Sequence, residues 1–280
     1  MTQPNQGASS ARNLAFSTCQ GEYVQWLDAD DLLAPDKIEK QMAVFESGVS
    51  DRTLLSSSWG HFNSNTARAK FIPTDLWYDL SPVEWLLRKI EQDLYMQPAT
   101  WLVSRTLTDS AGPWDTRLSL DDDGEYSCRL VRESNGVKFV PDAKVFYRRG
   151  FNTLSDIDYS PRKLESQRLA LQLQIEHLLA LENTDRTRRA GIKFLQTYAI
   201  LFYPERVDLI SEFEKLAKEL GGRLETPQLS WKYAWIQKLF GWTAAKRAQR
   251  AYNRLKSAIL RTAEDGSHAS PRQFARQHGS

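Results

Sequence analysis

The chain has 280 residues, of which 41% are hydrophobic and 26% charged, a composition typical of globular proteins. No apolar run approaches the ~20 residues that a membrane-spanning helix needs, and the first residues lack the basic and apolar segments of a secretory signal. The net charge of +2 conceals an asymmetry, because residues 1–150 carry 16 Lys and Arg against 21 Asp and Glu, whereas residues 151–280 carry 21 against 14.

The first half of the chain predicts alternating strands and helices. Residues 22–27 form a short β-prone run that ends at the acidic loop 28–31, and a helix with apolar residues on one face is predicted from Pro35. Further strands are predicted at 53–57, 100–104, 138–140 and 143–148, and further helices at 82–90 and 123–132. This alternation favours a layered α/β domain over a helical bundle or a sandwich.

The second half predicts helices only. They are expected at 161–181, 186–202, 204–220 and 231–260, the last one broken near Gly241. The polar stretch from Glu264 has no periodicity and predicts disorder. We therefore expect three segments, an α/β domain at 1–155, a helical region at 156–262 and a disordered tail at 263–280.

Three carboxylates, Asp28, Asp30 and Asp31, follow the first predicted strand. Loops at the ends of strands are where open α/β sheets bind their ligands, and carboxylates at i and i+2 can converge on one hard cation such as Mg²⁺ or Mn²⁺. The alternative is that Asp31 caps the following helix and that the others are solvated turn residues. The D-x-D pattern alone leaves both interpretations open.

Several stretches, taken in order, resemble the central part of family 2 glycosyltransferases. They are the loop and helix start at 3–14 (QPNQGASSARNL), the triplet GEY at 21–23, the strand end LDADD at 27–31 and the helix start DDGEYSCR at 122–129. The resemblance covers roughly residues 3–155. It implies a GT-A fold, which is a Rossmann-like α/β domain, here partial and followed by an all-helical C-terminal region. Such domains bind a nucleotide-diphosphate sugar and invert its anomeric centre.

The resemblance also implies roles for the acidic residues. Asp30 is expected to ligate Mg²⁺ or Mn²⁺, which would neutralise charge on the departing diphosphate, and Asp28 to contact the ribose or share the metal. Asp123 is expected to be the general base, with Asp122 and Glu125 supporting the acceptor side. The alternative for these last three residues is a helix N-terminus that favours carboxylates through its dipole.

Basic and aromatic residues complete the expected site. Arg12 and Asn13 are expected near the nucleotide. Many GT-A enzymes place a His after the last strand, but this chain has none there, so Arg148 or Arg149 is expected to hold the diphosphate instead. Three aromatic residues are candidates for the acceptor pocket, with core packing as the alternative: Trp59, His61 and Phe62.

The segments that come first in the family have no counterpart here. A strand ending near P-x-Y-N and a later V-V-D-D-G-S segment normally build the nucleotide-binding half of the fold. On this resemblance the chain is expected to lack about 70–80 residues of that half. It is then expected to bind nucleotide sugar weakly or not at all by itself, since strand edges would be left unpaired.

The basic excess of the second half lies largely in residues 226–263, which carry eight Lys or Arg and no acid. Trp231, Trp235, Leu239 and Trp242 recur there at helical spacing. An interfacial helix on an anionic membrane and a stripe packed on neighbouring helices both remain open. Nucleic acid is disfavoured, because no recognised nucleic-acid-binding motif is present.

The sequence thus predicts a metal-assisted, inverting glycosyltransferase. It would move a sugar from a nucleotide-diphosphate donor to a saccharide or lipid-linked acceptor, in the cytoplasm or peripherally at the inner face of the plasma membrane. The alternative is a non-catalytic remnant of such an enzyme that serves in protein or membrane association.

Overall fold

The computed structural model describes residues 2–148, 160–227 and 229–267. The chain divides into two compact units. The first comprises Met1–Leu201 with Ser211–Glu225, and the second Phe202–Ile210 with Thr226–Ser280. The domain boundary expected near residue 155 falls in residues 149–159, outside the described residues.

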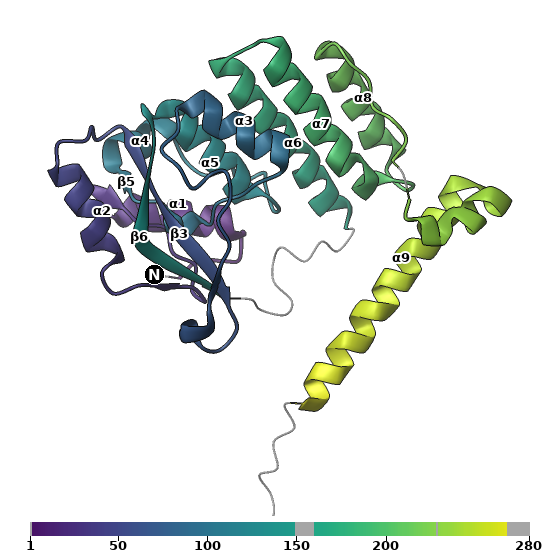
Figure 1. The fold of residues 1–280 in the computed structure, drawn as a ribbon, viewed down its shortest axis with the longest axis horizontal. Helices are drawn as coiled ribbons and strands as arrows, with labels where there is room; N and C mark the ends of the chain where they lie inside the picture. Colours follow the sequence, from purple (N-terminus) through teal and green to yellow (C-terminus); the bar gives the residue numbers. More distant parts are fainter. Residues whose placement is uncertain (1, 149–159, 228, 268–280) are drawn as a thin grey trace, which may run out of the picture. The chain divides into compact units, whose positions relative to one another are not determined.

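A four-stranded sheet of order β2-β6-β3-β4 runs through the described part of the first unit (Figure 1). Its strands are β2 (Leu32–Leu33), β3 (Thr53–Phe62), β4 (Lys70–Phe71) and β6 (Gly136–Arg148). β3 and β6 pair in parallel, and the two short edge strands are antiparallel to their neighbours. The ladder shifts between Ser57 and Ser58, whose partners are Val140 and Lys144, so the two strands predicted at 138–148 are one bulged strand.

A second, two-stranded pairing joins the first predicted strand to the rest. β1 (Tyr23–Val24) is antiparallel to β5 (Val103–Ser104), and it is shorter than the run predicted at 22–27. An isolated bridge between Leu55 and Leu102 connects this pair to β3. The acidic loop therefore leaves a strand that is held at the side of the main sheet.

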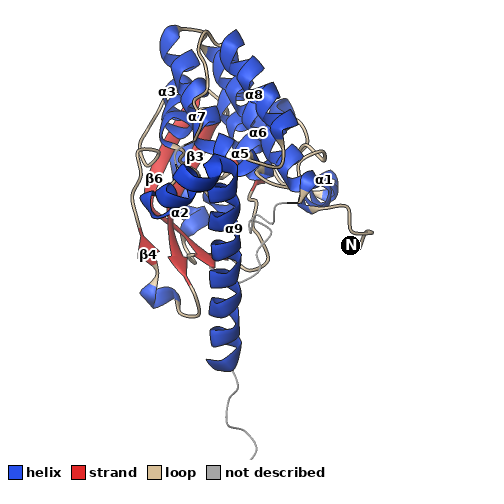
Figure 2. Ribbon diagram, turned by 90° about the vertical axis from the view of Figure 1, so that its right-hand side faces the viewer, coloured by secondary structure: helices blue, strands red, loops and turns tan. Residues whose placement is uncertain are grey.

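Helices lie beside the layer formed by β3, β4 and β6 (Figure 2). Those that precede β6 are α1 (Ala8–Thr18), α2 (Lys37–Glu46), α3 (Pro82–Gln92), α4 (Arg105–Ala111) and α5 (Asp122–Glu133). Those that follow are α6 (Pro161–Leu181), α7 (Asp185–Phe202) and α8 (Val207–Glu219), close to the predicted ranges. Short 3₁₀ turns occur at Thr66–Arg68, Pro98–Thr100 and Trp231–Tyr233. The predicted α/β class with C-terminal helices is confirmed.

Local sequence explains where α3 begins and which face it buries. Ser81 is its N-cap, with Oγ accepting a hydrogen bond from the Glu84 amide at 3.4 Å, and Pro82 occupies the first helical position. The helix buries Trp85, whose ring meets that of Trp101 at 5.7 Å in a T-shaped arrangement. This aromatic pair forms part of the core of the first unit.

The second unit contains α9 (Ala234–Ser267), which is interrupted at Gly241, where φ is 83°. Beyond the interruption, the Trp242 indole donates to the Pro227 carbonyl at 2.8 Å and its ring lies 4.8 Å from that of Tyr203. The prediction that Trp242 continues one stripe with Trp231 was therefore wrong, because the left-handed residue between them changes the helix register. α9 also extends past the predicted start of the disordered tail, and residues 268–280 lie outside the described residues.

Within the described part of the chain, no helix is long and apolar enough to cross a bilayer.

Candidate active site

Arg12 on α1 connects the acidic loop to the start of α5. Its Nη2 donates to Asp28 Oδ1 at 2.8 Å and its Nη1 to Asp122 Oδ2 at 2.9 Å. Ser9 Oγ donates to the same Asp122 oxygen at 3.0 Å, and the guanidinium lies 4.3 Å from the centre of the Trp114 ring. Burial lowers the pKa of Arg12, but the two carboxylates outweigh it and the net shift is upward. Two acidic clusters far apart in the sequence thus belong to one site.

Asn13 holds the loop that leads toward α5. Its Nδ2 donates to the Trp114 carbonyl at 2.9 Å, while the Trp114 amide donates to its Oδ1 at 2.8 Å. Trp114 in turn stacks on Tyr126 with ring centres 4.0 Å apart. Asn13, which the sequence predicts near the nucleotide, thus also holds the backbone of Trp114 in place. The sequence did not indicate this second role.

The loop after β1 contains Asp31, a carboxylate whose contacts were not predicted from the sequence. Asp31 is buried, its Oδ1 accepts the Arg148 amide at 2.9 Å, and its Oδ2 has no hydrogen-bond partner among the described residues. Burial raises the pKa of Asp31 to about 6 against the lowering effect of the Arg148 amide, and the charges of Asp30 and Asp28 add to the rise. Asp31 caps no helix, because the N-cap of α2 is Asp36, so that alternative was wrong.

Arg148, at the end of β6, binds the backbone of the same acidic loop. Its Nε donates to the Asp30 carbonyl at 2.8 Å and its Nη1 to the Asn63 carbonyl at 3.0 Å. Its guanidinium also lies 4.5 Å from the centre of the buried Phe62 ring. The predicted diphosphate residue thus lies at the acidic loop, whereas Arg149 is outside the described residues.

The start of α5 is fixed by an unusual N-cap. Asp121 has a left-handed backbone, with φ 59°, and its Oδ2 accepts from Gln167 at 3.0 Å and Gln174 at 2.7 Å, both on α6. A Cβ on Gly124 would lie 2.0 Å from Asp121 Oδ1, so any other residue here would displace the Asp121 carboxylate. The first turn of α5 is therefore anchored to α6.

Asp123, the predicted general base, lies in that first turn. The Gly124 amide donates to its Oδ1 at 2.9 Å. Burial raises the pKa of Asp123 to about 7, with further contributions from the charges of Asp121 and Asp122. A carboxyl group with this pKa can exchange a proton near neutral pH, as a general base must.

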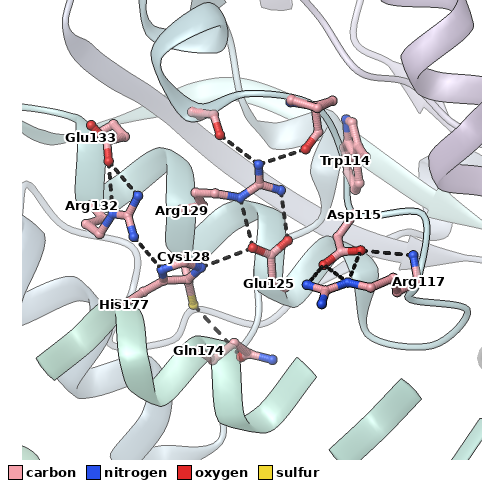
Figure 3. Close-up of polar contacts among 12 residues, drawn as sticks. Trp114, Asp115, Arg117, Glu125, Cys128, Arg129, Arg132, Glu133, Gln174 and His177 are labelled. Atoms are coloured by element: carbon pink, nitrogen blue, oxygen red, sulfur yellow. Dashed lines mark hydrogen bonds and ion pairs between the residues drawn. The ribbon is translucent and has the colours of Figure 1, made fainter. Parts of the chain in front are cut away.

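Glu125 is engaged elsewhere (Figure 3). It is only 3% exposed, and it accepts from Arg129 at 2.8 and 2.9 Å and contacts His177 Nε2 at 3.0 Å. Burial opposes its charge, but these hydrogen bonds more than compensate and lower the pKa of Glu125. Both of its oxygens meet protein groups on α5 and α6. The contacts give the predicted acceptor-side role of Glu125 no support and make it part of the helix packing.

Aromatic side chains lie beside the carboxylates. The Trp59 ring lies 4.8 Å from that of His61, 5.1 Å from that of Tyr95 and 6.0 Å from that of Tyr147. Burial raises the pKa of Tyr147, and the charges of Asp31 and Asp123 add to the rise, so both carboxylates act on this hydroxyl. Trp59 is itself buried, as the core alternative requires, whereas Tyr95 is 49% exposed.

The donor set at the loop is compatible with a hard cation. Among the described residues no group of three or more His, Cys, Asp or Glu is arranged to hold a metal ion. Mg²⁺, however, is often held by one or two carboxylates together with substrate phosphates. Asp28 and Asp30 supply such oxygens, and the buried, unpartnered Asp31 Oδ2 lies in the same loop.

A cleft of about 450 Å³ opens between α1 and the segment around β1. Its lining includes Arg12, Ala15, Tyr23, Trp26 and Asp28. The volume falls within the range of small-molecule sites.

Residues 1–91 match the family model described as "Glycosyl transferase family 2". The resemblance to family 2 glycosyltransferases is confirmed. The chain is 24% identical over 192 residues to the uncharacterized glycosyltransferase EpsJ of Bacillus subtilis, covering 65% of this chain and 52% of EpsJ. It is 38% identical over 82 residues to the putative teichuronic acid biosynthesis glycosyltransferase TuaG of the same organism, covering 28% of this chain and 31% of TuaG. The match thus spans about half of EpsJ and a third of TuaG.

Solved structures give the same fold. S. aureus TarS, residues 1–349, superposes with a TM-score of 0.55 and 16% identity over 78% of this chain and 63% of that chain. The same fragment in complex with UDP-GlcNAc superposes with a TM-score of 0.51 and 16% identity over 82% of this chain and 77% of that chain. The GT-A type of α/β fold is thereby confirmed.

Proposed function

We propose that this chain transfers a sugar from a nucleotide-diphosphate donor to a hydroxyl of a saccharide or lipid-linked acceptor, with inversion and with the help of Mg²⁺ or Mn²⁺. The observation that carries the proposal is the bridge through Arg12, which brings Asp28 of the acidic loop and Asp122 of α5 into one site. Related proteins point the same way, since TarS has been crystallised with UDP-GlcNAc and TuaG is named for the synthesis of a polysaccharide.

The proposed chemistry divides between two sides of the site. On the donor side, Asp30 and Asp28 would hold the cation, which supplies charge neutralisation for the departing diphosphate. Arg148 keeps a positive charge at the same loop, and Arg12 with Asn13 would contact the nucleotide. Their contacts within the protein fix these groups before a ligand arrives, so little reorganisation is needed on binding.

On the acceptor side, Asp123 would take the proton of the attacking acceptor hydroxyl. The oxygen of that hydroxyl forms the bond to the anomeric carbon while the bond from this carbon to the diphosphate breaks. The pKa of about 7 matches this task, because the carboxylate is available near neutral pH and still binds a proton well. Asp122 is held by Arg12 and Ser9 beside it and contributes negative charge to the site. The rings of Tyr95 and Tyr147 provide apolar surface for a sugar face.

The test is transfer from UDP-GlcNAc in the presence of Mn²⁺, measured as release of UDP with and without saccharide acceptors. Asp123→Asn is expected to reduce turnover by at least about a hundredfold while leaving donor binding by calorimetry unchanged. Turnover of the unmodified chain is expected to fall as the pH drops below about 7, where Asp123 becomes protonated.

The matched control is Asp51→Asn, which removes an exposed carboxylate of the same unit and should leave turnover unchanged. Full turnover by Asp123→Asn would overturn the assignment of the base. Absence of both donor binding and transfer across uridine and guanosine diphosphate sugars would overturn transfer by this chain alone. It would agree with the weak donor binding expected from the sequence and with the alternative, a non-catalytic relative that serves in association.

A further inference from the structure

The start of α9 exposes large apolar side chains. Trp231 is 80% exposed, Trp235 61%, Leu239 68% and Phe240 69%. Trp231, Trp235 and Leu239 are spaced four residues apart and share one face of the helical stretch that begins at Trp231. Scattered apolar residues on a surface are ordinary, but a contiguous aromatic group of this kind marks an interaction site.

This face is distinct from the one that packs within the second unit. After the interruption at Gly241, the helix turns Trp242 toward Pro227 and Tyr203 and buries Ala245 completely. The residues of α9 that pack within this unit therefore include Trp242 and Ala245, which follow Gly241. The apolar side chains before it, at Trp231, Trp235, Leu239 and Phe240, are not used in the packing of this unit.

The segment that carries the exposed face has charges of one sign. Residues 226–263 carry eight Lys or Arg and no Asp or Glu. Lys232 and Lys238 lie within the exposed stretch itself, and both are exposed. A partner must therefore accept apolar side chains and offer negative charge over an area several residues long.

We propose that the face formed by residues 231–240 binds the surface of an anionic lipid bilayer. Trp231, Trp235 and Leu239 enter the boundary between headgroups and acyl chains, and the flanking lysines contact lipid phosphates. Tryptophan rings favour this boundary, and each basic residue near an anionic surface adds to the attraction. The helix would lie in the plane of the interface, because one face is apolar and lysines lie along the same stretch.

The observations favour lipid over other anionic partners. Nucleic acid would use the positive charge but would leave an exposed leucine and phenylalanine without a partner. A second copy of the same face would bury the apolar side chains but would bring Lys232 and Lys238 of both copies together. A bilayer of anionic lipid accommodates both features at once.

The test is co-flotation of the full 280-residue chain with vesicles. Binding is expected to equimolar phosphatidylcholine and phosphatidylglycerol, to weaken with added salt, and to be absent with phosphatidylcholine alone. Replacing the two exposed indoles together, Trp231→Ala with Trp235→Ala, is expected to weaken partitioning about tenfold or more. Reversing the charges, Lys232→Glu with Lys238→Glu, is expected to abolish it.

The matched control is Ile72→Ala, which removes a 64% exposed apolar side chain from the first unit and should leave partitioning unchanged. Circular dichroism establishes that each variant remains folded, as expected for substitutions at exposed positions. The proposal is overturned if the chain binds neither kind of vesicle, or if the double tryptophan variant partitions like the parent. Concentration-dependent dimers that this variant abolishes, without vesicle binding, would assign the face to a second copy.

Discussion

Arg12 shows how one side chain can join two parts of a site. Its side chain is 17% exposed and pairs with Asp28 and Asp122. Replacing it by methionine would leave Asp122, itself only 18% exposed, without its cationic partner. Because removing one member of a partly buried ion pair leaves the other uncompensated, we expect Arg12→Met to lower the free energy of unfolding by about 2–4 kcal/mol, measured by urea denaturation.

An exposed arginine provides the comparison for this variant. Arg117 also pairs with an aspartate, Asp115, at 2.6 Å, but its side chain is 66% exposed. Arg117→Met should cost less than about 1 kcal/mol, as surface ion pairs usually do. Equal losses for the two variants would show that the bridge through Arg12 contributes no more than a surface pair.

The carboxyl group of Asp123 makes stability depend on pH in an unusual direction. Its pKa rises from 3.8 to about 7 on folding, so the folded chain holds this proton more tightly than the unfolded chain does. The resulting stabilisation is complete below the unfolded pKa and is lost as the pH rises through about 7. Asp123→Asn, which stays neutral, is therefore expected to raise the free energy of unfolding at pH 8 by about 1–2 kcal/mol.

The measurement is a series of urea titrations of parent and variant from pH 5 to pH 8. The two stabilities should converge toward the acidic end, where Asp123 carries its proton. A difference that does not change with pH would show that Asp123 titrates at its ordinary pKa. The expected gain in stability with loss of turnover is the trade that active sites commonly show.

At the scale of elements, α5 and α6 are joined by a buried polar network rather than by apolar contacts alone. Glu125 links Arg129 on its own helix to His177 on α6, and Arg129 donates further to the carbonyls of Ala111 and Pro113 at 2.7 Å each. Glu125→Ala would leave the guanidinium without its carboxylate at a 13% exposed site. We expect a loss of about 3–5 kcal/mol in the free energy of unfolding.

The C-terminal end of α6 supplies a comparison for Glu125. Glu182 follows the end of α6 and pairs with Arg186, which is 46% exposed. Glu182→Ala should lower the free energy of unfolding far less than Glu125→Ala does, because a surface ion pair contributes little to stability. If a denaturation series gave Glu125→Ala a similarly small effect, the contact between α5 and α6 would depend on its apolar residues.

Much of the arrangement of elements could be predicted from the sequence. The helices at 161–181 and 186–202 follow apolar spacing and clear boundaries, and the structure has them at Pro161–Leu181 and Asp185–Phe202. The sequence did not predict the parallel pairing of β3 with β6 or the bridge from β3 to Leu102. Strand order depends on contacts between segments that are distant in the sequence. The kink at Gly241 was predicted, but its effect on Trp242 depends on a φ angle that the sequence does not show.

At the scale of the whole molecule, the motifs named residues that the structure brings together, but they did not predict the contacts between them. Asp28 and Asp122 were expected in one site, and Arg12 was expected beside a nucleotide, but nothing in their spacing predicts that Arg12 would pair with both. Asp31 was missed because its partner is the backbone amide of Arg148, 117 residues later in the sequence. Glu125 shares its motif with Asp123, yet the helix turns its side chain to the interior.

The bridge through Arg12 has a consequence for how ligands at the two acidic groups influence each other. A divalent cation at Asp28 and the guanidinium of Arg12 would compete for one carboxylate, so each weakens the other's hold. A ligand that draws Arg12 away from Asp28 would therefore raise the affinity for the cation, and by thermodynamic reciprocity the cation would raise the affinity for that ligand by the same factor. Cation binding at the acidic loop would thus change the ion pair of Asp122 in the first turn of α5 through Arg12, which contacts both.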